Sequence, residues 1–281
     1  MIAVRDGTLP VLKPFRLAGT SPPALRLNAR HGVLIVLALA VAVFIGDAQA
    51  QPGSATPSIL ETLFKWTPLL GQGFALDVAM SFLAMGIGTV AGVFVGLALL
   101  SLRTPTRGLA WVVTQIFRNS PWLVLLFYVM LLMPFELRIG GLTIPLPDWL
   151  KATFGLALPV MANVAEIVRG AVRSIPFGQW EACEALAFTR RQTMWMVILP
   201  QCVRRMTPPW MNLYAILVAG IPLTSVVGVS ESMTLTGDIL SSEGRNELLV
   251  PMYLYLLLWF FIYCYPIALA TTALERRFQV R

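Results

Sequence analysis

Charged side chains are scarce in this chain of 281 residues. Only 12% of its residues are Asp, Glu, Lys or Arg, whereas a soluble globular domain carries about 25%. Hydrophobic residues make up 57% of the sequence, and its mean hydropathy is +0.74. This composition excludes an ordinary soluble domain. It predicts a chain that lies mostly within a lipid bilayer, where each spanning helix needs about 20 apolar residues.

Residue types that carry metal, redox or nucleophilic chemistry are also few. His31 is the single histidine, and Cys183, Cys202 and Cys264 have no CxxC or histidine-paired spacing. The sequence contains no GxSxG or HExxH pattern and no GxxxxGKS or GxxxxGKT run that would hold the phosphates of ATP. We therefore expect no catalytic residues, no cofactor, no metal site and no ATP site in this chain.

The apolar residues fall into six runs that are separated by charged or polar residues. These candidate spans cover about residues 32–46, 73–100, 109–134, 152–171, 209–229 and 248–273. We predict an all-α, polytopic membrane protein with about six transmembrane helices. Its expected divisions are a basic tail (1–31), an N-terminal transmembrane helix with an external interfacial segment (32–72), a transmembrane domain (73–273) and a C-terminal tail (274–281).

The first apolar run has two interpretations. It ends near Ala48, Gln49 and Ala50, which resemble a signal-peptidase site, so residues 32–50 could be a cleaved signal or a retained helix. We favour the retained helix because a basic segment of 30 residues is long for the start of a signal peptide. Residues 57–68 then predict either a short helix in the outer interface or a simple connector, and residues 135–151 predict a loop.

Small and polar residues mark particular points inside the predicted spans. Gly88, Gly92 and Gly96 recur every fourth residue, a pattern that permits close contact between two helices. The run Arg118-Asn119-Ser120-Pro121 predicts a break or kink. Glu166 is the one carboxylate that the sequence places clearly inside a span, and Arg169, three residues later, can pair with it.

Positive charge predicts the orientation of the spans. Of the 21 Lys and Arg residues, only Lys65, Arg138, Lys151 and Arg245 fall in segments assigned to the outside. Cytoplasmic loops carry an excess of Lys and Arg, so both termini are expected in the cytoplasm. The net charge of +7 is then a consequence of topology, and nucleic-acid binding is not needed to explain it.

A polar and amphipathic insert occupies residues 174–205, between two predicted spans. Pro176 and Gly178 precede a segment that can form a short helix with one apolar face. Thr189 and Gln192 match a capping box and predict the start of a second helix. Two helices joined at a corner would project from the membrane, although an insert lying along the membrane surface is the alternative.

The insert also carries a family pattern. The run GQWEACEALAFTRRQTMWMVILPQCVRRMTPPWMN resembles the EAA loop of binding-protein-dependent ABC importer permeases. Upstream, FRNSPWLVLLF and AEIVRGAVRSIPFGQWEA are similar to segments of the polar amino-acid branch of that family. The matching positions are Gly178, Gln179, Glu181, Ala182, Ala185, Leu186, Ile198, Leu199, Pro200, Gln201, Arg204, Pro208 and Asn212.

This resemblance implies a type I importer permease of the bacterial cytoplasmic membrane that carries a polar amino acid by alternating access. Its five-helix core would have an additional N-terminal helix. It would pair with a second permease subunit, identical or different, and receive solute from an external solute-binding protein. Cytoplasmic ATP-binding subunits would dock on a coupling segment that comprises Gly178, Gln179, Glu181, Ala182, Ala185, Leu186 and Ala187.

Three positions depart from the family pattern. Ala187 replaces a glycine, so the turn there lacks the residue that adopts left-handed backbone most easily. Cys183 replaces an alanine. The family's KxTS run is absent, because Ala219, Ile221 and Pro222 stand at its positions. The implied coupling is therefore better defined than the implied substrate.

Four residues are candidates for the translocation path: Asn163, Glu166, Gly220 and Pro222. Ionisable residues inside spans usually face a cavity or a partner, and Pro222 beside Gly220 should kink its helix and free backbone carbonyls. The alternatives are an internal ion pair and a purely structural kink. A secondary transporter or channel is the rival function, and it would require ion-coupling carboxylates in several spans.

Overall fold

The computed structural model describes residues 32, 34–36, 38, 41, 57–139 and 142–278. Four of its helical segments are long and apolar enough to cross a membrane, and a fifth candidate is a helix pair bent by 108°. This confirms the five core spans expected from the sequence. The choice between a signal and a retained helix for residues 32–50 lies outside the described residues, apart from a few single positions.

Nearly all of the described chain is helical. In chain order, its elements are α2 (Ile59–Leu99), α3 (Thr104–Asn119), α4 (Trp122–Leu132), β1 (Glu136–Ile139), β2 (Leu142–Pro145), α5 (Asp148–Arg173), α6 (Phe177–Ala185), α7 (Arg190–Gln192), the π-helix η1 (Thr193–Ile198), α8 (Leu199–Gly220), the 3-10 helix η2 (Ile221–Val227), α9 (Ser232–Glu243), the 3-10 helix η3 (Asn246–Leu248) and α10 (Leu249–Phe278).

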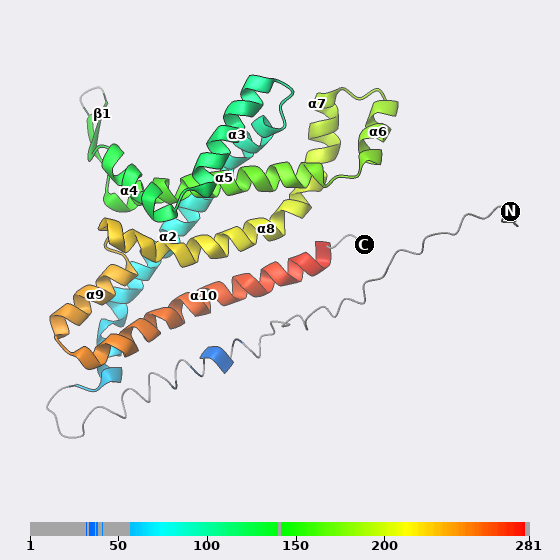
Figure 1. Cartoon of the computed structure of the whole chain (residues 1–281). Coiled ribbons are helices and arrows are strands. Elements are labelled where there is room, and N and C mark those ends of the chain that lie inside the picture. The colour runs from blue at the N-terminus through cyan, green and yellow to red at the C-terminus, as the bar shows by residue number, and fades with distance from the viewer. Residues whose placement is uncertain are drawn as a thin grey trace, which may run out of the picture.

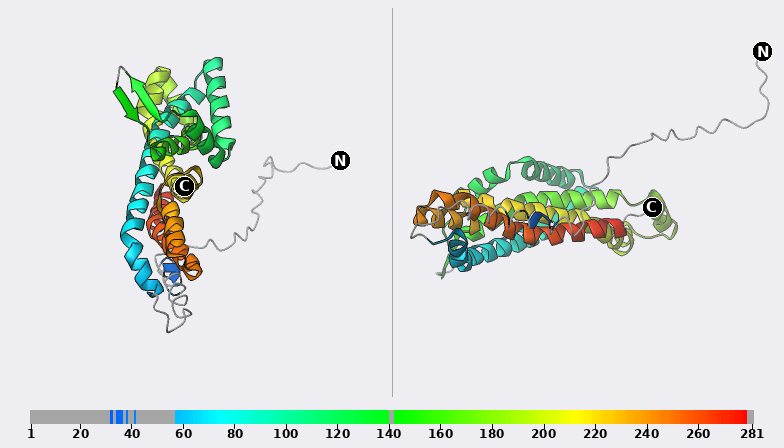
Figure 2. Two further views of the ribbon diagram at one scale, coloured as in Figure 1. Left: turned by 90° about the vertical axis from the view of Figure 1, so that its left-hand side faces the viewer. Right: turned by 90° about the horizontal axis from the view of Figure 1, so that it is seen from below.

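The long helices form an elongated bundle with two distinct ends. Helices α5, α8 and α10 run roughly side by side, and α2 crosses them diagonally (Figure 1). One end carries α6 and α7 and also the last turns of α10, and we call it the α6 end. The opposite end carries α9 and the first turns of α2, and we call it the α9 end. The right-hand view of Figure 2 shows the same elongated bundle from below, and the left-hand view looks roughly along α5, α8 and α10.

Helices α2 and α5 pack backbone against side chain along a row of glycines. A methyl group added at Gly92 would lie 2.6 Å from Val164 Cβ and 2.7 Å from the carbonyl oxygen of Met161. Gly88 faces Val160 and Gly96 faces Val168 in the same way. The expected close contact is confirmed. It gives α5 a fixed position against α2 over more than two helical turns.

The two predicted breaks in the spans are also confirmed. Helix α3 ends at Asn119 and α4 starts after Pro121, with the bend of 108° between them. Helix α8 ends at Gly220, and a 3-10 helix that contains Pro222 follows and stops at Gly228, whose φ is +89°. The breaks meet in space, because a methyl group on Gly220 would lie 3.1 Å from the ring of Trp122.

Residues 57–68 do not form a separate interfacial helix. They are the first turns of α2, which continues through Pro68 for 41 residues, and Ser58 caps its start. The apolar side chains of Ile59, Leu63 and Leu70 pack against Ile239 of α9 and Met252 of α10. This segment does have the apolar face that the sequence indicated, but the face packs against α9 and α10 and does not lie in the membrane interface.

The predicted loop at residues 135–151 is partly regular structure. Strands β1 and β2 form an antiparallel hairpin in which Leu137 is opposite Ile144. Helix α5 then begins at Asp148. Lys151 is buried at the base of the hairpin, where its Nζ donates to Asp148 Oδ1 (2.9 Å) and lies 4.0 Å from the ring centroid of Phe135.

The expectation that Glu166 is the only carboxylate inside a span is wrong. Asp77 lies in α2 with 2% of its surface exposed, and it accepts a hydrogen bond from Ser232 Oγ. The neighbouring Glu231, fully buried, caps α9 by accepting hydrogen bonds from the backbone N–H groups of Met233 (2.7 Å) and Thr234 (3.1 Å). This pair of carboxylates joins the start of α9, a helix that the sequence did not predict, to α2.

A second polar contact holds α9 at its other end. Lys65 Nζ donates to Glu243 Oε1 at 2.8 Å, and Trp66 Nε1 donates to the same oxygen at 2.7 Å. These hydrogen bonds lower the pKa of Glu243 below its usual value, because they stabilise the carboxylate. Helix α9 is therefore fastened to α2 at both of its ends.

The glycine row predicts a large effect of adding one methyl group. We expect Gly92→Ala to lower the free energy of unfolding by about 1 to 3 kcal/mol, since the new Cβ overlaps α5 and its backbone must move. Thermal or denaturant unfolding of the purified protein in detergent micelles measures the change. Gly86→Ala is the matched control, because a methyl group added there would meet no atom of another helix within 4 Å. Equal effects of the two substitutions would contradict the packing described above.

Candidate functional site

The insert at residues 174–205 leaves the bundle at the end of α5 and returns to it at the start of α8. The two ends of the insert are joined by Arg205, whose Nη1 donates to the carbonyl oxygen of Ser174 (2.7 Å) and to its Oγ (3.0 Å). Farther out, Gln201 Nε2 donates to Gln179 Oε1 at 3.4 Å. These contacts fix the base of the insert against both helices.

Apolar side chains fill the space beneath the insert. Val172 and Ile175 from the end of α5 are buried together with Ile198 and Cys202 from the start of the next helix. Trp180 of α6 and Met194 of the π-helix pack against this cluster. The expected apolar face of α6 therefore exists, and it rests on the ends of α5 and α8.

The outer surface of α6 is exposed, and the hydrogen bond between Gln179 and Gln201 is its one side-chain hydrogen bond within the described chain. Phe177 and Leu186 are 74% and 70% exposed, although both are large and apolar. Glu181 lies on this surface and has no hydrogen bond or ion pair among the described residues. The other predicted coupling residues are exposed on the same short segment: Gly178, Gln179, Ala182, Ala185 and Ala187.

The corner between α6 and α7 is closed by backbone hydrogen bonds. The N–H of Phe188 donates to the carbonyl oxygen of Cys183 (3.0 Å), and the N–H of Ala187 donates to the carbonyl oxygen of Glu184 (2.9 Å). This pair of bonds is a Schellman motif, which requires left-handed backbone at Ala187. Its φ is +55°, and no other described non-glycine residue has a positive φ. Alanine therefore forms this turn in left-handed backbone, a conformation that is sterically less favourable for alanine than for the glycine of the family pattern.

The second helix of the insert begins as predicted. Thr189 and Gln192 form the expected capping box, with Thr189 N–H donating to Gln192 Oε1 (2.9 Å) and Gln192 N–H donating to Thr189 Oγ1 (3.4 Å). From Arg190 the chain continues as α7, the π-helix and α8 without interruption. The second helix of the insert is therefore the first part of a membrane-spanning helix. The π-helix Thr193–Ile198 connects it to α8.

A cavity of about 350 Å³ brings together two of the four predicted path residues. Asn163 and Glu166 of α5 line it with Arg118 of α3 and Asn212 of α8. Gly220 and Pro222 do not line this cavity. Gly220 packs on Trp122, and Pro222 borders a separate, apolar cavity of about 680 Å³ between η2, α9 and α10.

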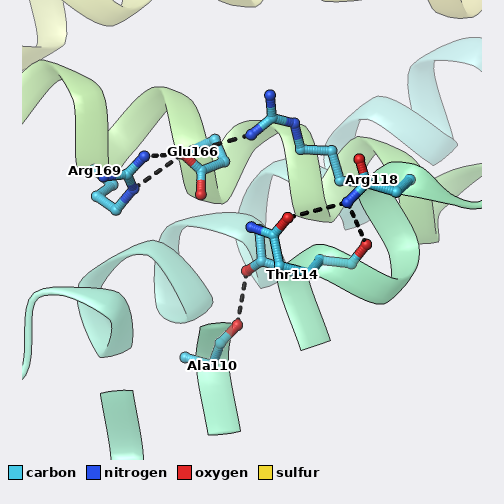
Figure 3. Close-up of polar contacts among 7 residues, drawn as sticks. Ala110, Thr114, Arg118, Glu166 and Arg169 are labelled. Atoms are coloured by element: carbon cyan, nitrogen blue, oxygen red, sulfur yellow. Dashed lines mark hydrogen bonds and ion pairs between the residues drawn. The ribbon is translucent and has the colours of Figure 1, made fainter. Parts of the chain in front are cut away.

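Glu166 is the centre of charge in the first cavity. Its Oε2 accepts a hydrogen bond from Arg169 Nε (2.9 Å), as the sequence predicted, and lies 3.8 Å from Arg118 Nη1 (Figure 3). The side chain of Glu166 is 14% exposed, compared with 46% for Arg118. Sequence reasoning missed Arg118 as a partner, because the broken span of α3 and α4 brings it across to α5.

Comparison with known proteins identifies the family. The family described as "binding-protein-dependent transport system inner membrane component" matches residues 88–280. The chain belongs to this family. Its membrane-spanning bundle is that of a type I ABC importer permease, a subunit that provides the transmembrane path. Such permeases work with separate cytoplasmic ATPase subunits.

Individual relatives match most of this permease. It is 29% identical over 225 residues to the L-cystine transport system permease protein TcyB of Bacillus subtilis, covering 80% of this chain and 92% of that protein. It is 30% identical over 212 residues to the probable amino-acid ABC transporter permease protein YckA of the same organism, covering 75% and 89%.

Solved structures share the fold. A crystal structure of an amino acid ABC transporter with histidines aligns with a TM-score of 0.66 at 26% identity, over 79% of this permease and 99% of that chain. An inward-facing structure of the MetNI methionine ABC transporter aligns with a TM-score of 0.57 at 21% identity, over 76% and 97% of the two chains. Both solved structures therefore share the arrangement of the core helices found in this permease.

The corner at Ala187 yields a prediction about stability. We expect Ala187→Gly to raise the free energy of unfolding by up to about 1 kcal/mol, because glycine adopts left-handed backbone without the steric cost that Cβ imposes. Ala182→Gly, in the interior of α6, is the control and should lower it by about 1 kcal/mol. Unfolding curves of the three proteins measure both values. A loss of stability in Ala187→Gly would show that the turn is not held as described.

Proposed function

We propose that this permease imports a polar amino acid across the bacterial cytoplasmic membrane, with the α6 end and both chain termini on the cytoplasmic side. The charge distribution supports this orientation. The α6 end carries many Arg residues, whereas Lys65 and Arg245 at the α9 end each face a glutamate. The arginines in or beside the helix termini that meet at the α6 end are Arg103, Arg173, Arg190, Arg191, Arg204, Arg205, Arg276 and Arg277.

The exposed surface of α6 is the observation on which the coupling proposal rests. An ATP-binding subunit docks on this surface, with Glu181 and Gln179 supplying polar contacts and Phe177 and Leu186 supplying apolar ones. The surface suits a partner because it combines large exposed apolar side chains with a carboxylate that has no partner in the described chain. Closure of the ATPase then pulls α6 and moves the helices to which it is attached.

The contacts around α6 transmit this movement to the spans. Arg205 joins the two ends of the insert, and the apolar cluster beneath α6 contains the ends of both α5 and α8. Helices α5 and α8 also form two walls of the cavity around Glu166. A displacement of α6 therefore changes the cavity, which is the requirement for alternating access.

The cavity around Glu166 has the charges that an amino acid needs. The Glu166 carboxylate can bind an α-amino group, the Arg118 guanidinium can bind an α-carboxylate, and the amides of Asn163 and Asn212 add hydrogen-bonding groups. The names of the similar permeases include L-cystine and amino-acid transport systems. We assign the substrate to the class of polar amino acids on these two grounds.

The complete importer contains more than this chain. A second permease subunit, identical or different, completes the transmembrane path, and an external solute-binding protein delivers the amino acid at the α9 end. The family description supports the latter, since it names transport that depends on a binding protein. Exposed apolar side chains on α3 and α4, including Trp111 and Leu131, are available to lipid or to the second subunit.

The docking of the ATPase is tested by changes on α6. We expect Glu181→Ala to reduce co-purification of the ATP-binding subunit and solute uptake by roughly tenfold, since a hydrogen bond to a charged group contributes about 1.5 to 3 kcal/mol. Deletion of residues 179–188 should abolish both while the protein still inserts. Glu184→Ala is the matched control, because Glu184 is also exposed on α6 but lies outside the family pattern. Normal ATPase association and uptake after the deletion would indicate a transporter that needs no ATPase.

The role of Glu166 is tested separately from coupling. We expect Glu166→Gln to reduce uptake by roughly tenfold or more while ATPase association is unchanged, because Arg118 and Arg169 lose their shared carboxylate and the cavity loses its only negative group among the lining residues. Uptake of radiolabelled amino acids into proteoliposomes measures the effect. Glu243→Gln, which removes a comparable ion pair at the α9 end, should leave uptake close to normal. Equal losses in both variants would indicate a general effect on folding.

A further inference from the structure

A pocket at the α6 end is used neither by the coupling surface nor by the cavity around Glu166. It has a volume of about 350 Å³ and lies between the last turn of α2 and the start of the long helix that begins at Arg190. Its lining residues are Leu97, Leu100, Arg190, Arg191, Met194, Trp195 and Leu199. They combine two guanidinium groups with a floor that is entirely apolar.

The positive charge in this pocket is not neutralised within the described chain. Arg190 donates one hydrogen bond from Nη2 to the carbonyl oxygen of Leu100 (3.2 Å), which holds its guanidinium over the end of α2. Arg191 has no hydrogen bond among the described residues, and neither arginine forms an ion pair there. No carboxylate lines the pocket. The two guanidinium groups can therefore bind an anion.

The apolar floor distinguishes this pocket from a site for a small free anion. Leu97 and Leu100 lie at the end of α2, a membrane-spanning helix, and Leu199 lies at the start of α8. Trp195, which is 60% exposed, borders the pocket, and tryptophan is enriched where the hydrocarbon of a membrane meets its headgroups. The pocket thus presents two cations beside hydrocarbon contacts at the ends of two membrane-spanning helices.

We propose that this pocket binds the headgroup phosphate of an anionic phospholipid, with an acyl chain lying on Leu97, Leu100 and Leu199. The assignment of the lipid to the inner leaflet rests on the orientation proposed above. Basic pockets beside transmembrane helices on the cytoplasmic side suit such headgroups. A lipid bound in this pocket would hold the corner between α6 and α7 at the membrane surface, so that the anionic lipid content of the membrane would modulate coupling.

Quenching of Trp195 fluorescence by brominated lipid tests this proposal directly. The full chain is placed in phosphatidylcholine nanodiscs that contain increasing fractions of phosphatidylglycerol with brominated acyl chains, or of brominated phosphatidylcholine. The Trp195 contribution is the difference between the parent protein and Trp195→Phe. We expect quenching at lower lipid fractions with phosphatidylglycerol. Arg191→Gln should weaken this preference about fivefold, the contribution of one cation near an anionic surface.

The control is Arg277→Gln, which makes the same charge change at the same end of the bundle but outside the pocket. It should leave the preference for phosphatidylglycerol unchanged. Arg191→Gln is preferred to a change at Arg190, because Arg190 also makes a backbone contact that supports the fold. The measurement needs neither transport nor an ATPase, so its failure would leave the proposed function standing.

Three outcomes would overturn the proposal. Equal quenching by the two brominated lipids would show that the pocket does not select charge. Displacement of phosphatidylglycerol by excess inorganic phosphate, as complete as that by unlabelled phosphatidylglycerol, would indicate a site for a free anion. Loss of ATPase co-purification in Arg191→Gln, with unchanged quenching, would indicate that Arg191 contacts the protein partner.

Discussion

The contact between the glycine row of α2 and the valines of α5 is the constraint on which the rest of the bundle depends. Gly88, Gly92 and Gly96 allow the backbone of α2 to approach α5 more closely than any side chain would permit. Helix α5 in turn carries Glu166 in the cavity and leads directly into the insert. Because lipid tails are as apolar as the helices, close packing of this kind supplies much of the specificity of assembly in a membrane. The position of α5 follows from this helix pair, and with it one wall of the cavity and the point where the insert begins.

Several polar contacts between elements of this protein lie at the ends and breaks of its helices. At the α9 end, Asp77 and Glu231 join α9 to α2, and Glu243 accepts hydrogen bonds from the first turns of α2. In the middle, the break between α3 and α4 allows Arg118 to reach Glu166 on α5. At the α6 end, Arg205 at the end of the insert donates a hydrogen bond to Ser174 at its start. These polar groups join one element to another, while large apolar side chains such as Trp111 and Leu131 stay exposed on the outside of the bundle.

The sequence predicted the features whose causes are local. The five core spans, the breaks at Pro121 and Pro222, the capping box at Thr189 and the pairing of Glu166 with Arg169 each depend on residues close together in the chain. The sequence did not predict features that depend on contacts between segments far apart in the chain. The first turns of α2 are covered by α9 and α10, and Asp77 is buried by Ser232, which lies 155 residues later. The partnership of Arg118 with Glu166 likewise required a bend of 108° whose direction no local pattern encodes.

The contact between Arg205 and Ser174 has a consequence for the evolution of the insert. Because Arg205 Nη1 lies 2.7 Å from the carbonyl oxygen of Ser174, the chain leaves the bundle and returns to it at neighbouring points, and the residues between them form a closed excursion. Segments with adjacent ends tolerate exchange and insertion well. Within the insert, α6 and the corner that follows it precede the span that begins at Arg190, so they are the part that can vary in sequence with least effect on the packing of the long helices.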